Sequence, residues 1–444
     1  MMRPLCFVLM PFGKKFAAQG TVVDFDLIYR DFIAPAIEEA GLEPLRADDE
    51  QTGGIIHKPM FERLILCDYA VADLTTANAN VFYELGLRHA VRPYSTALLF
   101  AVGAGQLPFD VALMRALPYR LGADGAAADP LQAKTMLAAR LREAQKRATD
   151  SPVFQLVEGY RPPEIAHVKT DVFRDRVRYS ALFKGRLALA RKAGETALRA
   201  VEKELGNIAN AESGVVVDLF LSYRAVKCWQ GMIDLAARMS PPLAGAVMVR
   251  EQLGFALNRA GRGEEAERML LDLIEQRGTS SETCGILGRI YKDRWEDALK
   301  AGDRFVAQGL LGKAIDAYLR GFESDWRDAY PGINAVTLME LRDPPDVRRE
   351  QLIPVVRYSV ERRMAAGKPD FWDHATLLEL AVLAKDQTRA EAVLSDALAA
   401  VREVWEPETT VRNLRLIREA RERRGEPVTW ALEVEQELVR RAAT

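Results

Sequence analysis

Short apolar runs alternate with amphipathic segments up to about residue 148, and this alternation limits the fold more than any other feature. Strands that alternate with helices usually pair in parallel, and the helices then cover the faces of the sheet. The runs expected to form strands are 5–10, 42–46, 69–73, 96–101 and 117–121, and the segments expected to form helices are 25–40, 54–67, 81–91 and 130–146. With right-handed crossovers, the pattern predicts a doubly wound α/β domain.

Strand patterns nearly vanish beyond a proline-containing connection at 151–163. The stretches 168–205 and 215–239 are expected to form long helices, and the pattern from Pro241 onward is helix, short turn, helix. We therefore predict three parts: an α/β domain over 1–148, a helical connecting part over 149–240, and all-α tetratricopeptide-like repeats over 241–444.

A 34-residue period supports the repeat assignment. Leu253-Gly254 and Leu287-Gly288 are separated by this period, which is that of the tetratricopeptide repeat. Two helices of a repeat cross closely only where side chains are short. Residues of suitable size are expected at the helix crossings of three units: Ala266 and Leu270; Ala314, Tyr318 and Gly321, if 293–309 holds an insertion; and Leu378, Ala381, Ala390, Leu394 and Ala397.

Composition excludes several classes of partner and site. At 444 residues the chain is too long for one ordinary core. Its formal net charge of -2 provides no basic field, so neither nucleic acid nor an anionic membrane is expected as a partner. Its 4 cysteines form no CxxC pair and its 4 histidines form no cluster, so no metal site or disulfide framework is expected. This favours a reduced, cytoplasmic setting.

The amino-terminal apolar run is expected to be a strand. It leads into Gly13-Lys14-Lys15 without the small-residue cleavage site of a signal peptide. No other segment is long and apolar enough to span a bilayer.

Candidate site residues follow the predicted strands. In a flavodoxin-like strand order, 2-1-3-4-5, the first and third strands are neighbours, and ligands bind beyond their carboxyl ends. Phe12 and Gly13 leave the first strand, and Asp73 ends the third. Gly13 permits close approach of a ligand, and loop N–H groups there could hold a phosphate or ribose hydroxyls. Asp73 either accepts hydrogen bonds from a ribose or caps the next turn, and Asp48 could reach the opposite rim.

Glu84 is the candidate with two open interpretations. It lies in the first turns of a helix that opens at about Val81, among apolar neighbours, where a carboxylate could act as a nucleophile or stabilise positive charge at an anomeric carbon. Alternatively, it forms a surface ion pair with Arg88 at i,i+4. Asn80 is expected to cap the helix, with Asn78 shaping the preceding turn, and His89 is expected to pack against the sheet.

The residues up to about 121 resemble the nucleoside 2-deoxyribosyltransferase-like branch of the TIR-like domains. The matching strings are MPFG, RADD, GGIIHKPMFERLILCDYAVADLT and NANVFYELGLRHA. The resemblance implies that Glu84 is the catalytic carboxylate at a ribosyl anomeric carbon while an N-glycosidic bond breaks. NAD or another nucleotide is then the substrate, with no separate cofactor. The resemblance matches Asp73 to the family's strand-end aspartate and Asn80 to its helix-opening asparagine. Together with the other residues at the crevice, the expected substrate-binding set is Phe12, Gly13, Asp48, Asp73, Asn78, Asn80 and Tyr83.

The residues from about 151 onward resemble the TRAFs-binding, tetratricopeptide-like regulatory region of apoptosis signal-regulating kinases. The matching strings include SPVF, TDVFR, GILGRIYKDRW, AYPGINAVTL and TTVRNLRLI, whereas the kinase motifs VAIK, HRD and DFG do not occur. The resemblance implies protein partners that bind the helical repeats. A TIR-like domain joined to this region resembles bacterial conflict or stress-signalling proteins, and because TIR-like effectors commonly self-associate, a homo-oligomer is expected.

Three functions therefore remain open. One is a regulated N-glycoside hydrolase or transferase acting on NAD or another nucleotide through Glu84. The second is a non-catalytic scaffold that senses a nucleotide or recruits partners. The third is a purely structural interaction protein, with Glu84 in a surface ion pair.

Overall fold

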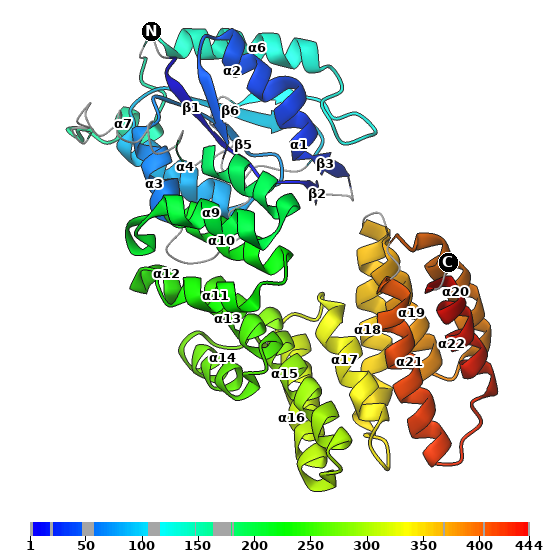
Figure 1. Cartoon of the computed structure of the whole chain (residues 1–444). Coiled ribbons are helices and arrows are strands. Elements are labelled where there is room, and N and C mark those ends of the chain that lie inside the picture. The colour runs from blue at the N-terminus through cyan, green and yellow to red at the C-terminus, as the bar shows by residue number, and fades with distance from the viewer. Residues whose placement is uncertain are drawn as a thin grey trace. The chain divides into compact units, whose positions relative to one another are not determined.

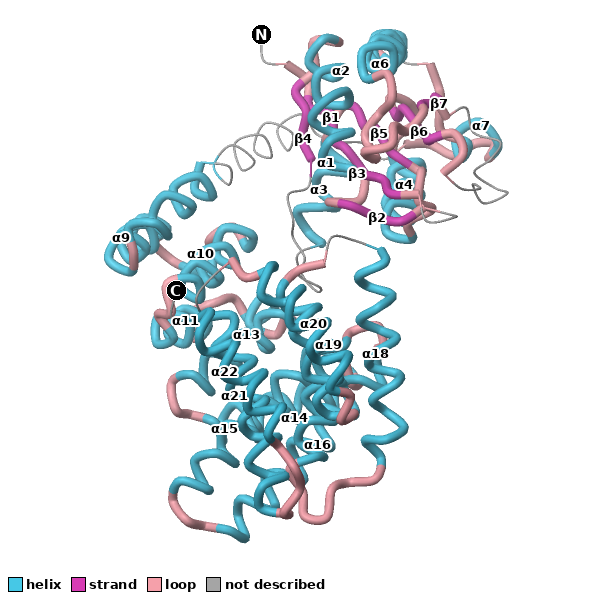
Figure 2. Tube along the Cα trace, turned by 90° about the vertical axis from the view of Figure 1, so that its right-hand side faces the viewer, coloured by secondary structure: helices cyan, strands magenta, loops and turns pink. Residues whose placement is uncertain are grey.

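The computed structural model describes residues 3–17, 21–46, 57–104, 116–146, 148–162, 179, 182–366, 369–402 and 405–442. The chain divides into two compact units. Unit 1 comprises Met1–Ser222 and Met239–Ala246, and unit 2 comprises Tyr223–Arg238 and Val247–Thr444. Figure 1 shows strands in unit 1 only, and Figure 2 shows unit 2 built from helices.

A five-stranded parallel sheet forms the centre of unit 1. Its order is β4-β1-β5-β6-β7, which confirms the predicted order 2-1-3-4-5. Residues Leu9 and Ala72 are partners in the register between β1 and β5, so these two strands end side by side. The strands are β1 (Leu5–Leu9), β4 (Glu43–Arg46), β5 (Tyr69–Asp73), β6 (Thr96–Ala101) and β7 (Leu117–Tyr119).

Helices cover both faces of this sheet, as predicted. One face carries a helical segment of α1 (Phe25–Ile28), a π-helical turn and α2 (Ala34–Glu39), together with α6 (Pro130–Ala144). The other face carries α3 (His57–Leu66) and α4 (Ala79–Val91). The remainder of the predicted helix 54–67, before His57, lies outside the described residues.

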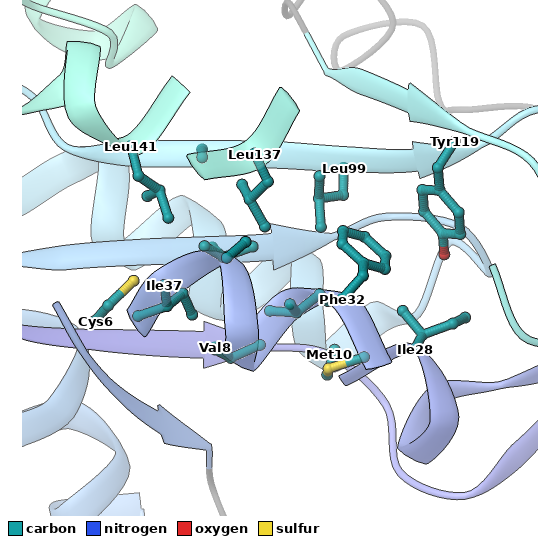
Figure 3. Packing of buried hydrophobic residues seen from close by; sticks show 14 of the residues in the cluster. Cys6, Val8, Met10, Ile28, Phe32, Ile37, Leu99, Tyr119, Leu137 and Leu141 are labelled. Atoms are coloured by element: carbon teal, nitrogen blue, oxygen red, sulfur yellow. The ribbon is translucent and has the colours of Figure 1, made fainter. Parts of the chain in front are cut away.

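Side chains of β1 are buried on both faces because the sheet is covered twice. Val8 and Met10 lie in one apolar cluster, with Phe32 of the π-helical turn and Leu137 of α6 (Figure 3). Phe7 and Leu9, which alternate with them, lie in the opposite cluster. This explains why β1 has a continuous apolar sequence instead of an alternating one.

A small antiparallel pair, β2 (Lys14–Phe16) and β3 (Val22–Asp24), was not predicted. The two strands have three residues each, and the side chains of β2 are exposed, so they leave no apolar pattern in the sequence.

The connecting part is more broken than predicted. A single helix was expected over 168–205. Residues 182–193 are helical, and α9 (Glu195–Leu205) follows after Gly194, whose φ of 95° interrupts the helix. Residues 168–178 lie outside the described residues. The prediction of a single helix over 215–239 is wrong. The segment forms two helices, α10 (Ser213–Ala225) and α11 (Trp229–Ala236), which are separated by Lys227 in the left-handed conformation with φ 58°. Three further short helical segments are α7 (Pro152–Leu156), a 3₁₀ turn (Ile208–Asn210) and α12 (Pro241–Ala244).

Five helix pairs follow in the described part of unit 2, and they confirm the predicted helical solenoid (Figures 1 and 2). Within each pair the two helices pack together, and the first helices of successive pairs contact one another. The pairs are α13 (Val247–Arg259) with α14 (Gly263–Arg277), α15 (Ser281–Lys300) with α16 (Arg304–Ser324), α17 (Ala329–Glu340) with α18 (Arg348–Ala366), α19 (Phe371–Leu383) with α20 (Gln387–Ala400), and α21 (Trp405–Arg423) with α22 (Thr429–Ala442).

Glycines mark the close crossings inside the first pairs. A Cβ on Gly254 would lie 3.0 Å from Leu270 Cδ2, and a Cβ on Gly288 would lie 2.7 Å from the Tyr318 ring. The residues of the insertion expected over 293–309 lie in the long helices α15 and α16, which have 20 and 21 residues, and in the turn between them. The period of 34 residues therefore identifies helix crossings, as predicted.

A buried carboxylate, Glu340, fastens three helix pairs at one end. Its oxygens lie 2.8 Å from Arg421 Nε, 2.7 Å from Arg424 Nη2 and 2.9 Å from Arg349 Nε. Arg421 also donates to the carbonyl oxygens of Val382, at 2.9 Å, and Leu383, at 3.0 Å. The ends of α17, α19 and α21 are thus held by one network.

The glycine crossings give a stability prediction. Gly288→Ala should lower the free energy of unfolding by about 1–3 kcal/mol, because the added methyl group has to displace the buried Tyr318 ring. Gly309→Ala in the same helix pair is the matched control. A Cβ there meets nothing within 4 Å, so the better helix former should raise the free energy by about 0.5–1 kcal/mol. Urea unfolding followed by circular dichroism measures both, and equal effects would contradict the packing described.

Candidate active site

The segments from which a site was predicted lie at the carboxyl edge of the sheet. Phe12 and Gly13 leave β1, and Asp73 ends the neighbouring strand β5. Arg46, on the other side of β1, ends β4. Asp48, the predicted residue of the opposite rim, lies outside the described residues.

Phe12 and Gly13 are engaged by Arg46 and Asp26. The Arg46 guanidinium lies 4.4 Å from the centre of the Phe12 ring, and it donates a hydrogen bond of 2.8 Å to Asp26 Oδ1. The Gly13 amide, with φ 62°, donates to the same oxygen at 3.2 Å. Partial burial opposes ionisation of Asp26, but these two hydrogen bonds outweigh it and hold the pKa of that carboxyl below its ordinary value. The Gly13 N–H expected to meet a phosphate is therefore occupied by a carboxylate.

Asp73 is buried and both of its oxygens are used within the protein. Oδ1 accepts hydrogen bonds from the Thr75 amide, at 3.0 Å, and from the Thr75 hydroxyl, at 2.5 Å, and Oδ2 accepts from the Tyr119 hydroxyl at 2.8 Å. Thr75 Oγ1 in turn accepts from the Ala101 amide at 3.0 Å. Burial raises the pKa of Asp73 in spite of these hydrogen bonds. The geometry matches the capping alternative, since Asp73 ties the ends of β5, β6 and β7 together.

Asn78 caps α4. Its Oδ1 accepts hydrogen bonds from the amides of Asn80, at 3.0 Å, and Val81, at 3.3 Å, so the helix begins at Ala79. The prediction that Asn80 is the cap was wrong, because the helix starts two residues before the expected Val81. Asn80 and Tyr83 are exposed on its first turns.

Glu84 lies half-buried on α4, and burial raises the pKa of its carboxyl to about 7. The predicted surface pair with Arg88 is wrong. Arg88 is fully buried and donates to the carbonyl oxygens of Leu64, at 2.8 Å, and Cys67, at 2.7 Å. Within the described residues Glu84 has no hydrogen-bond or ion-pair partner, so its carboxylate is available for chemistry or for a ligand.

The other side of α4 holds unit 1 together. Burial lowers the pKa of Arg88 to about 10, which leaves it charged at neutral pH, and lowers that of His89 to about 4, which leaves it neutral. His89 is buried against the fold, as predicted, and its carbonyl oxygen accepts a hydrogen bond of 2.7 Å from Ser151 Oγ. The string that contains Glu84 is thus largely structural.

Sequence reasoning missed Arg46 and Tyr119. Both end strands at the carboxyl edge, which is the signal that could have identified them. In the part of the chain that the structure describes, no three His, Cys, Asp or Glu side chains gather to hold a metal ion, and no helix is apolar and long enough to cross a bilayer.

Two protein kinases are similar to this chain in sequence. Over 219 residues the chain is 28% identical to mitogen-activated protein kinase kinase kinase nsy-1 of Caenorhabditis elegans, covering 45% of this chain and 14% of that protein. Over 235 residues it is 25% identical to mitogen-activated protein kinase kinase kinase 15 of Mus musculus, covering 50% of this chain and 17% of that protein. The chain thus spans less than a fifth of the length of these relatives.

Among solved structures, a thermophilic TPR protein from Thermus thermophilus matches with a TM-score of 0.35 and 14% identity, over 46% of this chain and 99% of that one. The repeat assignment rests on the helix pairs themselves. The family model described as the MAP3K TRAFs-binding domain matches residues 81–438, from α4 to the last helix. Its match covers most of the chain, and the chain belongs to the MAP3K TRAFs-binding domain family.

Proposed function

We propose that this chain is a regulatory scaffold that binds protein partners through unit 2. The observation that carries the proposal is the family match over residues 81–438, which takes in the whole series of helix pairs. The family is named for the binding of TRAFs. For this chain we propose only that the partner is a protein.

The construction of unit 2 supports this role. Stacked helix pairs present a surface that is long compared with the depth of the core beneath it. The Glu340 network holds three pairs at fixed positions, so little conformational entropy is lost when a partner binds. A rigid, extended surface of this kind suits protein recognition.

A crosslinking experiment tests the scaffold. The full chain is purified from cells with its bound proteins, crosslinked through lysines and analysed by mass spectrometry. Intermolecular crosslinks are expected at exposed lysines of unit 2, such as Lys300, Lys313 and Lys385. Lys14 and Lys134 of unit 1 are the internal comparison. Crosslinks confined to unit 1, or no partner protein at all, would contradict the proposal.

A second candidate function is the cleavage of an N-glycosidic bond in NAD or another nucleotide. It is favoured by one observation, the half-buried Glu84 with a pKa raised to about 7 and no partner among the described residues. An ionised carboxylate could attack the anomeric carbon or stabilise the oxocarbenium-like charge that develops there. The resemblance of MPFG and NANVFYELGLRHA to TIR-like and deoxyribosyltransferase-like domains also belongs to this proposal.

The enzymatic candidate predicts a defined pH profile. If Glu84 acts as the ionised form, base release from NAD or a nucleotide panel should rise between pH 6 and 8 with a midpoint at about 7. Glu84→Gln should lower the rate at least about 100-fold, whereas Glu143→Gln on the exposed face of α6 should leave it unchanged. Mass spectrometry of the reaction products at several protein concentrations measures this. Base release that survives in Glu84→Gln would exclude Glu84 as the catalytic group.

The raised pKa also predicts a stability effect that does not depend on catalysis. The folded chain keeps a proton on Glu84 up to about pH 7, whereas the unfolded chain releases it near the ordinary value of 4.5. Stability contributed by the neutral form is therefore lost as pH rises from 4.5 to 7. Glu84→Gln should raise the thermal midpoint at pH 8 and change it little at pH 5, with Glu143→Gln as the control. A shift of equal size at both pH values would show that Glu84 is not desolvated.

A further inference from the structure

The inner side of unit 2, where the first helices converge, is occupied by the chain's own polar side chains. Lys292 of α15 donates a hydrogen bond of 3.0 Å to Asn413 of α21, although the two are 121 residues apart. Asn413 donates to Glu379 of α19 at 3.1 Å, and Thr337 of α17 donates to the same carboxylate. Lys292, Thr337 and Glu379 are buried. These polar groups are therefore engaged with one another and are not available to a ligand.

An apolar patch lies instead on the outside, around α18, which forms one edge of unit 2 in Figure 2. Trp326, in the turn before α17, is 49% exposed, and Val355 and Tyr358 of α18 are 42% and 53% exposed. We call these three residues the aromatic patch. The rings of Trp326 and Tyr358 are stacked, with centroids 6.3 Å apart and planes at 28°.

The aromatic patch is held in place before any partner binds. Ser359 Oγ, next to Tyr358, donates a hydrogen bond of 2.6 Å to the carbonyl oxygen of Trp326. This bond ties the turn that carries Trp326 to the helix that carries Tyr358. Preorganisation lowers the entropy lost on association.

A basic side chain, Arg362, lies on α18 beside the aromatic patch. It comes one turn beyond Tyr358, is exposed and has no ion-pair partner within the described residues. Three acidic residues near the patch are engaged with other basic groups: Asp325 with Arg327, Glu350 with Arg349, and Glu361 with Arg389. The Arg362 guanidinium can therefore pair with a carboxylate of a partner.

We propose that the aromatic patch and Arg362 form the docking site for a segment of a partner protein that combines aliphatic or aromatic side chains with acidic ones. An apolar side chain of the segment packs on the Trp326 and Tyr358 rings, and a carboxylate of the segment pairs with Arg362. Trp, Tyr and Arg are the residue types most enriched at interface hot spots. The inference rests on the proposed scaffold function and assigns the surface that performs it.

Binding of synthetic peptides to the full chain tests this assignment. The probe is a peptide array in which Leu and Phe positions are flanked by Glu, and the comparison array carries Lys in place of Glu. We expect micromolar binding of acidic members only, weakened at least about tenfold in the double variant Trp326→Ala/Tyr358→Ala and in Arg362→Glu. Arg362→Glu changes one exposed charge, so it keeps the test valid if the double variant fails to fold.

Two matched variants serve as controls. Phe305→Ala removes an aromatic side chain that is 88% exposed at the start of α16, and Arg304→Glu reverses an exposed charge beside it; both should bind the acidic peptides like the parent chain. The docking site is overturned if Lys-flanked peptides bind equally well, if the control variants lose binding to the same extent, or if no acidic peptide binds. It is also overturned if the patch variants instead abolish a concentration-dependent dimer, which would make a second copy the occupant. If crosslinks on unit 2 persist but no acidic peptide binds, the proposed scaffold function stands and only this docking site is rejected.

Discussion

Three arginines converge on the single buried carboxylate of Glu340, and the arrangement of unit 2 depends on this contact. Glu340 ends α17, Arg421 and Arg424 come from α21 and the turn that follows it, and Arg421 also binds carbonyl oxygens at the end of α19. Breaking a buried ion network by removing one partner costs about 3–5 kcal/mol, since it leaves charges uncompensated. The network therefore fixes the positions of helix ends, and with them the surface that unit 2 offers to a partner.

Buried arginine has a comparable role in unit 1. Arg88 joins the carboxyl end of α3 to the start of β6 through hydrogen bonds to the carbonyl oxygens of Leu64, Cys67 and Asp68 and to Ser95 Oγ. It lies four residues from Glu84 on the same helix. One short string thus contains both a residue that fixes the fold and a carboxylate left without a partner. The requirements of folding account for much of the string, while Asn80 and Tyr83 are exposed and Glu84 is half-buried.

The fold was largely predictable because it depends on periodicity. The sheet order followed from the alternation of strands and helices, and the helix crossings at Gly254 and Gly288 followed from the period of 34 residues. The site was less predictable because its hydrogen bonds join residues far apart in the sequence. Asp73 is bound by Tyr119, 46 residues away, and no local pattern indicates such a partner. The break at Lys227 was missed for a related reason, since a lysine at φ 58° carries none of the glycine or proline signals that end helices.

We infer that this member of the MAP3K TRAFs-binding domain family recognises partners on the outside of unit 2. Hydrogen–deuterium exchange of the full chain, alone and with a saturating acidic peptide from the array, tests it most directly. Slower exchange is expected at the turn 325–328 and along α18, with no change in the first helices α15, α19 and α21. Slower exchange confined to those first helices, or to α4 around Glu84, would contradict it.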